Sequence, residues 1–117
     1  DFLKRLMQYQ STLNDASRNM LSMADVGKKY RKAIDNFESR VGLLSEYVNT
    51  SKIKFQVIYG LTTLEYYDGF VFGFQFDRGN YPPIAQGGRY DSLCSILSKK
   101  GKSLRAIGSM VRMDFLK

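Results

Sequence analysis

The chain contains no histidine and a single cysteine, and both scarcities exclude familiar kinds of site. Serine triads, cysteine–histidine pairs and most zinc sites need a histidine, which another chain would have to supply. Cys94 has no partner for an internal disulfide, which favours a reducing cytoplasm. It lies among Leu93, Ile96 and Leu97, a setting typical of a buried, unreactive thiol. We therefore expect no metal site and no cofactor.

Long apolar runs are also missing from the chain. None approaches the roughly 18 residues that a membrane helix requires, and no secretory signal is visible. The sequence begins at Asp1 rather than methionine, and Lys117 follows an apolar-patterned stretch without a helix stop signal. From these ends we expect a piece of a longer protein.

Basic residues outnumber acidic ones, with 18 Lys and Arg against 11 Asp and Glu and a net charge of +7. Such an excess can attract nucleic acid or an acidic protein. The bases are scattered, however, and the densest run, Lys99, Lys100 and Lys102, surrounds Gly101 as in a solvated turn. Neither nucleic acid nor a membrane is the expected partner.

Two helices are predicted in the first part of the chain. Apolar residues recur at steps of three or four from residue 3 to residue 23, apart from one wider gap, and Gly27 is expected to break this helix. A second apolar stripe runs over residues 30–48. The aromatic and methionine side chains of these stripes are predicted to be core contacts.

After residue 51 the period changes from that of a helix to that of a strand. Residues 53–59 alternate as in a half-buried strand. In the next strand Phe70, Phe72, Phe74 and Phe76 point to one face, which we expect to form the core of the sheet. A turn over residues 77–80 should pair this strand antiparallel with one over residues 82–85.

The end of the chain is predicted to hold a short helix and a last strand. Gly87 and Gly88 lead into a helix over residues 91–97, which Asp91 or Ser92 can cap. A strand follows at residues 104–110, and then a helix that stops at residue 117. Helices packed on an antiparallel sheet make this an α+β protein, with a helical segment at 1–51 followed by a sheet-containing segment at 52–117.

Three stretches of the second segment resemble motifs of the histidyl-tRNA synthetase family. Residues 64–72, L-E-Y-Y-D-G-F-V-F, are similar to its histidine-binding stretch L-D-Y-Y-T-G-x-V-F. Residues 87–93, G-G-R-Y-D-S-L, are close to G-G-R-Y-D-x-L, and residues 106–116 look like motif 3, A-V-G-x-x-x-G-L-E-R-L. The order and spacing make the match specific. It implies the C-terminal half of a class II synthetase-like core, an antiparallel sheet flanked by helices.

The resemblance also implies a small amino-acid pocket. Two successive glycines let the backbone pass close to a ligand, and tyrosines offer a flat wall with a hydroxyl. The residues assigned to histidine binding on this basis are Tyr67, Tyr90, Gly87, Gly88, Gly108, Glu65 and Arg89. The alternative is that the tyrosines are core residues with satisfied hydroxyl groups.

The chain departs from the synthetase pattern at the positions that handle ATP. The family's Arg-Gly before the first motif is Thr62-Thr63 here, and its motif 3 arginine is Phe115. Its motif 3 glycine, which leaves room for adenine, is Arg112. A phenyl ring cannot neutralise a phosphate, so adenylation chemistry and catalytic residues are not expected.

These departures fit a paralogous family, the regulatory subunits of ATP phosphoribosyltransferase. That resemblance implies a non-catalytic role in the first step of histidine biosynthesis, activation of a short catalytic subunit, a possible response to histidine, and a homodimer of the full-length protein. A fragment of a histidyl-tRNA synthetase is the first alternative. A different synthetase-like paralogue acting as a binding module is the second.

Overall fold

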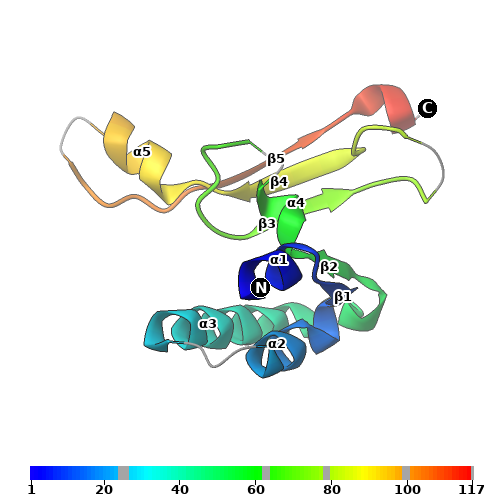
Figure 1. Ribbon diagram of the computed structural model, residues 1–117. Helices are drawn as coiled ribbons and strands as arrows, with labels where there is room; N and C mark the ends of the chain where they lie inside the picture. The colour runs from blue at the N-terminus through cyan, green and yellow to red at the C-terminus, as the bar shows by residue number, and fades with distance from the viewer. Residues whose placement is uncertain (24–26, 62–63, 78–79, 99–100, 117) are drawn as a thin grey trace. The chain divides into compact units, whose positions relative to one another are not determined.

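The computed structural model describes residues 1–23, 27–61, 64–77, 80–98 and 101–116 (Figure 1). The chain divides into two compact units, Asp1–Ile58 and Tyr59–Lys117. Each contains helices and an antiparallel sheet, so the prediction of an α+β fold is confirmed. The units meet seven residues beyond the boundary between residues 51 and 52 that the sequence suggested, and the assignment of 1–51 and 52–117 as family segments stays a prediction.

The first unit is built on two long helices and a small sheet. Its elements are α1 (Phe2–Met7), β1 (Gln10–Thr12), α2 (Leu13–Ser22), α3 (Lys28–Ser45), the 3-10 helix η1 (Thr50–Lys52) and β2 (Lys54–Gln56). The helix expected over residues 30–48 is confirmed as α3. The single helix expected over residues 3–23 is wrong, because β1 interrupts it at the wide gap in the apolar period and pairs antiparallel with β2.

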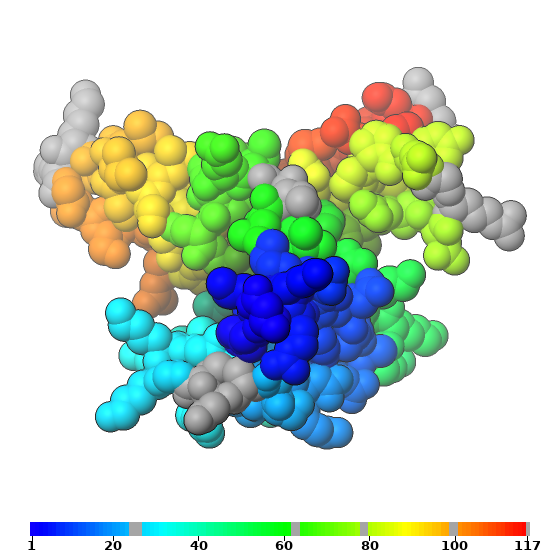
Figure 2. All heavy atoms as spheres, in the orientation of Figure 1, coloured from blue at the N-terminus to red at the C-terminus, as the bar shows by residue number. Residues whose placement is uncertain are grey.

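The buried core of the described residues lies in this first unit. Ala16, Met20 and Ile34 form its centre. Phe37 and Phe55 pack against them, and the centroids of these two rings are 4.9 Å apart. The opposite face of α3 is polar, and the side chains of Lys28, Lys29, Arg31 and Lys32 are exposed at its first turns (cyan, Figure 2). Burial of one apolar stripe thus explains why α3 is a helix here.

The second unit is a three-stranded sheet with short helices. Its strands are β3 (Val71–Phe74), β4 (Ala85–Arg89) and β5 (Ile107–Val111), in the order β3-β4-β5 with both pairs antiparallel. Helix α4 (Val57–Leu61) enters the unit, α5 (Asp91–Leu97) follows β4, and the 3-10 helix η2 (Met113–Leu116) follows β5. The helix predicted over residues 91–97 is therefore confirmed with its bounds.

All four predicted strands differ in extent, since β3 is shorter than the predicted 70–76 and β5 runs over 107–111 instead of 104–110. Residues 53–59 do not form one strand, since the chain turns into α4 after Gln56. The strand placed at residues 82–85 instead begins at Ala85 and runs to Arg89, so Gly87 and Gly88 lie inside the sheet. The predicted turn at 77–80 falls partly outside the described residues.

The phenylalanine face of β3 is less buried than expected. The rings of Phe70, Phe72 and Phe74 follow one another at 6.3 and 6.0 Å, which confirms that they share a face. However, Phe74 is 64% exposed and Phe76 is 45% exposed, so the prediction that this face forms a buried core is wrong for these two side chains.

Among the described helices, none has the length and apolar character needed to cross a lipid bilayer.

The burial of α3 gives a direct test of the core. Ile34 is 3% exposed and Leu43, on the same helix, is 64% exposed. Ile34→Ala should lower the free energy of unfolding by about 2–5 kcal/mol through cavity formation, whereas Leu43→Ala should change it by less than about 0.5 kcal/mol. Urea unfolding of both variants measures the difference. Equal losses would mean that the buried stripe of α3 is wrongly assigned.

Candidate functional site

Three glycines lie on one face of the β3-β4-β5 sheet. Gly88 is paired with Val71 on β3 and with Gly108 on β5, and cross-strand partners project to the same side. Gly73, two residues beyond Val71, faces the same way because side chains alternate along a strand. The result is a strip of bare backbone across the sheet.

A tyrosine side chain occupies the space over each of these glycines. A Cβ atom at Gly88 would lie 2.8 Å from Cδ1 of Tyr67, and one at Gly108 would lie 2.8 Å from the Tyr90 hydroxyl. A Cβ at Gly73 would overlap the hydroxyl of Tyr59. Real Cβ atoms do not approach other atoms so closely, so the glycines make room for these tyrosines. The sequence had indicated room for a ligand, and it gave no signal for Tyr59.

The tyrosine cluster consists of Tyr66, Tyr67 and Tyr90, whose rings touch one another. The ring centroids are 4.8 Å apart for Tyr66 and Tyr67, 5.7 Å for Tyr66 and Tyr90, and 6.3 Å for Tyr67 and Tyr90. Tyr66 is exposed, while Tyr67 and Tyr90 are half-buried. The two tyrosines that the motifs assign to histidine binding, Tyr67 and Tyr90, therefore lie side by side, and the motifs did not indicate Tyr66 as the third ring.

The phenol of Tyr67 is suited to donate a hydrogen bond. Three causes raise the pKa of Tyr67 above its ordinary value. The largest is partial desolvation, the next is a side-chain hydrogen bond with Tyr66, and the last is the nearby phenols of Tyr66, Tyr90 and Tyr59. The hydroxyl is therefore protonated at neutral pH. Tyr90 donates its hydroxyl to the carbonyl of Ile107 at 3.5 Å, a long contact that leaves it able to accept.

Gly87 and Arg89 lie on the other face of the sheet, because they alternate with Gly88. A Cβ at Gly87 would overlap the carbonyl oxygen of Gly108 and lie 2.7 Å from Cζ of Phe72, so this glycine makes room for the β5 backbone and for a phenylalanine. The Arg89 guanidinium forms an ion pair with Asp91, Nε to Oδ2 at 2.7 Å. Gly87 therefore lies on the opposite face of the sheet from Gly88 and Gly108. A histidine-binding role for Gly87 or Arg89 stays a prediction.

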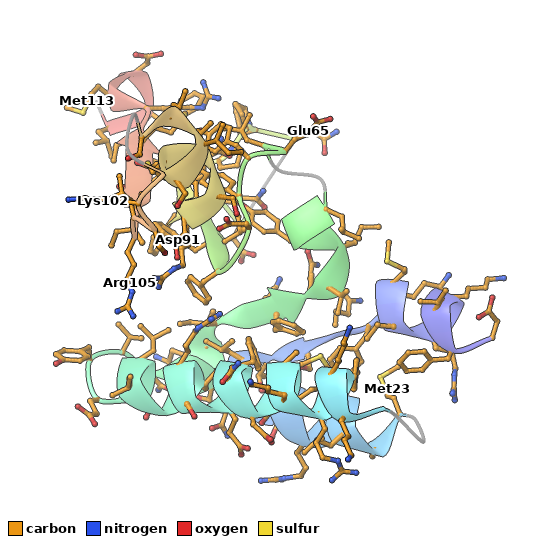
Figure 3. All side chains as sticks on the ribbon, turned by 90° about the vertical axis from the view of Figure 1, so that its left-hand side faces the viewer. Met23, Glu65, Asp91, Lys102, Arg105 and Met113 are labelled. Carbon is orange, nitrogen blue, oxygen red and sulfur yellow. The ribbon has the colours of Figure 1, made fainter. Side chains whose placement is uncertain are left out.

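Glu65 is placed at the edge of the site. It belongs to the turn at residues 64–67, in which the amide of Tyr67 donates to the carbonyl of Leu64 at 3.1 Å. Its side chain is exposed and points away from the sheet (Figure 3). Figure 3 also shows Lys102 and Arg105 on the segment that leads into β5. The structure brings Tyr67, Tyr90, Gly88 and Gly108 together and leaves Glu65 outside this group.

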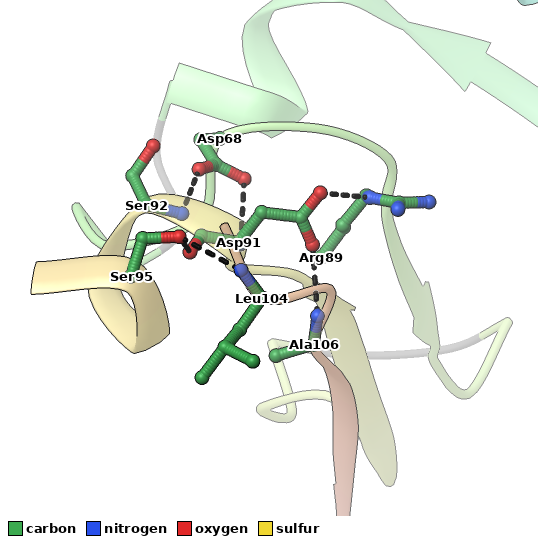
Figure 4. A network of polar contacts seen from close by, with 7 residues as sticks. All are labelled: Asp68, Arg89, Asp91, Ser92, Ser95, Leu104 and Ala106. Atoms are coloured by element: carbon green, nitrogen blue, oxygen red, sulfur yellow. Dashed lines mark hydrogen bonds and ion pairs between the residues drawn. The ribbon is translucent and has the colours of Figure 1, made fainter. Parts of the chain in front are cut away.

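A polar network joins the three motifs (Figure 4). The Asp68 carboxylate accepts from the backbone N–H of Asp91 at 3.2 Å and of Ser92 at 2.7 Å. The Asp91 carboxylate accepts from the backbone N–H of Ala106 at 2.8 Å as well as from Arg89. The predicted capping of α5 by Asp91 or Ser92 is therefore wrong, since Asp68 from the preceding motif satisfies its first N–H groups.

Both carboxylates of this network are held in the charged form. Hydrogen bonds from Ser92 lower the pKa of Asp68. The backbone N–H of Ala106, and then Arg89, lower the pKa of Asp91. Because these pKa values are depressed in the folded chain, the network stabilises the fold at pH values above the ordinary pKa of aspartate. This stabilisation is lost as the pH falls through the lowered pKa values.

The residues at the motif 3 departures are engaged in packing. Nε of Arg112 donates to the carbonyl of Pro83 at 3.1 Å. The Phe115 ring lies 6.1 Å from Phe76 and 6.3 Å from Tyr81, in a cluster of three rings. The expectation that Arg112 points into the space of an adenine stays a prediction, and Thr62 and Thr63 lie outside the described residues.

Among the residues that the structure describes, no group of three potential ligand side chains is placed to hold a metal ion. A shallow polar depression on the β1–β2 ribbon is lined by Gln10, Ser11, Lys54 and Gln56. None of the predicted histidine-binding residues lines this depression.

Comparison with known proteins identifies the family of the chain. The histidyl-tRNA synthetase family matches residues 1–116. Two curated relatives are named ATP phosphoribosyltransferase regulatory subunit: one from Mesorhizobium japonicum, 29% identical over 96% of the chain and 30% of the relative, and one from Agrobacterium fabrum, 30% identical over 100% and 31%. The chain thus spans under a third of the length of these relatives. No solved structure matches significantly. The chain belongs to the histidyl-tRNA synthetase family.

Proposed function

We propose that this chain is part of a regulatory subunit of ATP phosphoribosyltransferase, acting in the first step of histidine biosynthesis. Two curated relatives that bear this name align with 96% and 100% of the chain, which supports the proposal. In this role the full-length protein, a homodimer in the cytoplasm, binds the short catalytic subunit and activates it. It carries out no reaction of its own.

The observation that carries the non-catalytic part of the proposal is the position of Phe115. Its ring packs with Phe76 and Tyr81 where the synthetase motif has an arginine for the ATP phosphates. Arg112, the nearest cation of the same motif, has its Nε committed to the Pro83 carbonyl. Adenylation of an amino acid depends on neutralising the negative charge of the ATP phosphates. Loss of one cation that does so typically costs orders of magnitude in rate.

The tyrosine cluster is the proposed histidine site. Tyr67 supplies a protonated hydroxyl for one imidazole nitrogen, and Tyr90, whose ring centroid lies 6.3 Å from that of Tyr67, supplies a second hydroxyl. Flat aromatic walls with polar tips suit an imidazole, which is planar and needs partners for two nitrogens. Occupation of this site by histidine would let the subunit report the level of the pathway's end product.

A histidyl-tRNA synthetase fragment is the competing function, favoured by the name of the matching family. The two functions differ in whether histidine is activated with ATP. We predict that the full-length protein catalyses no histidine-dependent ATP–pyrophosphate exchange, because Phe115 and Arg112 replace the residues that serve ATP. An active synthetase assayed in parallel is the positive control. Exchange above the no-enzyme background would establish the synthetase and refute the regulatory proposal.

Activation of a partner tests the positive side of the proposal. Adding the full-length protein to a short-form ATP phosphoribosyltransferase catalytic subunit should raise the rate of phosphoribosyl transfer, and the two should co-elute in size-exclusion chromatography. The physical reason is that a regulatory subunit stabilises the active arrangement of its partner by binding it preferentially. Absence of both co-elution and activation would contradict the proposed partnership.

Substitutions in the tyrosine cluster test the ligand. Tyr67→Phe and Tyr90→Phe each remove a hydroxyl, so an imidazole nitrogen loses its partner at a cost of ~1–3 kcal/mol, or a roughly five- to hundred-fold weaker dissociation constant. Gly108→Val should abolish binding by displacing Tyr90, whose hydroxyl lies 2.8 Å from a Cβ at that position. Calorimetric titration of histidine into the full-length protein measures these changes.

The matched control for these variants is Tyr47→Phe, because Tyr47 is 82% exposed and belongs to the other unit. It should bind histidine as the unaltered protein does. If the Tyr67 and Tyr90 variants also bind histidine with unchanged affinity, the histidine site lies elsewhere in the protein.

A further inference from the structure

We propose that Asp68 is a positioning residue that fixes Tyr67 and Tyr90 relative to each other and so sets the geometry of the histidine site. The inference rests on the proposed histidine ligand for its functional consequence. Its structural part, that one carboxylate holds two tyrosine-bearing segments together, stands on the contacts of Asp68 alone.

The backbone around Asp68 is tied to the end of β4. The amide of Asp68 donates to the carbonyl of Arg89 at 3.0 Å, and the amide of Arg89 donates to the carbonyl of Phe70 at 2.9 Å. These two bonds continue the antiparallel pairing of β3 and β4 beyond the start of β3. Tyr67 and Tyr90, which neighbour Asp68 and Arg89 in sequence, are thereby brought to the same end of the strand pair.

The Asp68 side chain adds the connection that the backbone lacks. Its two oxygens take separate N–H groups, Oδ1 that of Asp91 and Oδ2 that of Ser92, directly after Tyr90. The carboxylate therefore spans from the segment that carries Tyr67 to the first turn of α5, which carries Tyr90 at its start. Tyr90 has no side-chain cap of its own to offer this helix, so removal of the Asp68 carboxylate frees both N–H groups.

An aspartate is chemically suited to this role in a way that the corresponding residue of the synthetase motif is not. The motif has a threonine at this position, and a single hydroxyl oxygen cannot meet two N–H groups with separate acceptors. The pKa of Asp68 is lowered by its hydrogen bonds, so the charged form, with both oxygens as acceptors, is present at neutral pH. Asp68 is thus a departure of this chain that strengthens the site, whereas Phe115 is a departure that removes ATP binding.

The test compares Asp68→Ala and Asp68→Asn in the full-length protein. The matched control is Asn49→Ala, which removes another side-chain cap, the Asn49 Oδ1 that accepts from the backbone N–H of Ser51 at 3.1 Å in the first unit. Two quantities are measured: the NMR signals of ring-labelled tyrosines and the calorimetric dissociation constant for histidine. Thermal melting verifies that each variant is folded, and Asp68→Asn, which keeps one acceptor oxygen, decides the matter if Asp68→Ala does not fold.

We expect Asp68→Ala to shift the ring signals of Tyr66, Tyr67 and Tyr90 and leave that of the exposed Tyr47 unchanged. Histidine affinity should fall about tenfold, as expected for loss of charge-assisted hydrogen bonds that orient the site. Asp68→Asn should lie between Asp68→Ala and the unaltered protein, and Asn49→Ala should match the unaltered protein in both measurements. A merely structural cap would lower the melting temperature of the variants without this graded loss of affinity.

Unchanged tyrosine signals and affinity in both Asp68 variants would overturn the inference. A loss of affinity as large in Asn49→Ala would also overturn it, since the effect would then be general destabilisation. If the unaltered protein binds no histidine, the proposed ligand is refuted, and the tyrosine signals alone decide whether Asp68 positions the rings. The failure of the proposed function is therefore distinguishable from the failure of this inference.

Discussion

The tyrosine rings can lie against the backbone of β4 and β5 because two Cβ atoms are missing there. Any side chain at Gly88 would collide with Tyr67, and any side chain at Gly108 would collide with Tyr90. Since Gly88 and Gly108 are direct partners across the strands, the two rings are brought side by side over one point of the sheet. The proposed histidine site, its hydroxyl groups and its aromatic walls all depend on this close approach.

Hydrogen bonds then join three motifs that are well separated in the sequence. Asp68 of the first motif caps α5, which begins within the second motif, and Asp91 of the second motif holds the backbone of Ala106 in the third. The tyrosines therefore rest on a connected framework in which each motif supports the next. The same framework leaves the ATP positions out: Arg112 bonds the Pro83 carbonyl and Phe115 joins an aromatic cluster. The family fold is retained, and the proposed loss of ATP chemistry rests on these two replacements.

Local patterns were sufficient where a single element buries a single face. The period of apolar residues predicted α3, and the spacing after Tyr90 predicted α5 with its bounds. They failed where partners are distant in sequence: β1 forms because Gln10–Thr12 pairs with Lys54–Gln56, which no local pattern indicates. The motifs grouped Gly87 with Gly88, but these residues lie inside β4, which begins at Ala85, so they point to opposite faces of the sheet. Tyr59 was missed because it lies in α4, where the sequence predicted the end of a strand, and Tyr66 was missed because it lies in the turn at residues 64–67.

The central claim is that histidine is recognised by tyrosine hydroxyls over a strip of glycine backbone. The most direct measurement is a crystal structure of the full-length protein grown with histidine. This mode of recognition predicts the imidazole against the tyrosine cluster, with a ring nitrogen within about 2.6–3.2 Å of the Tyr67 or Tyr90 hydroxyl. Histidine bound away from Tyr66, Tyr67 and Tyr90, with these rings packed as they are here, would contradict it.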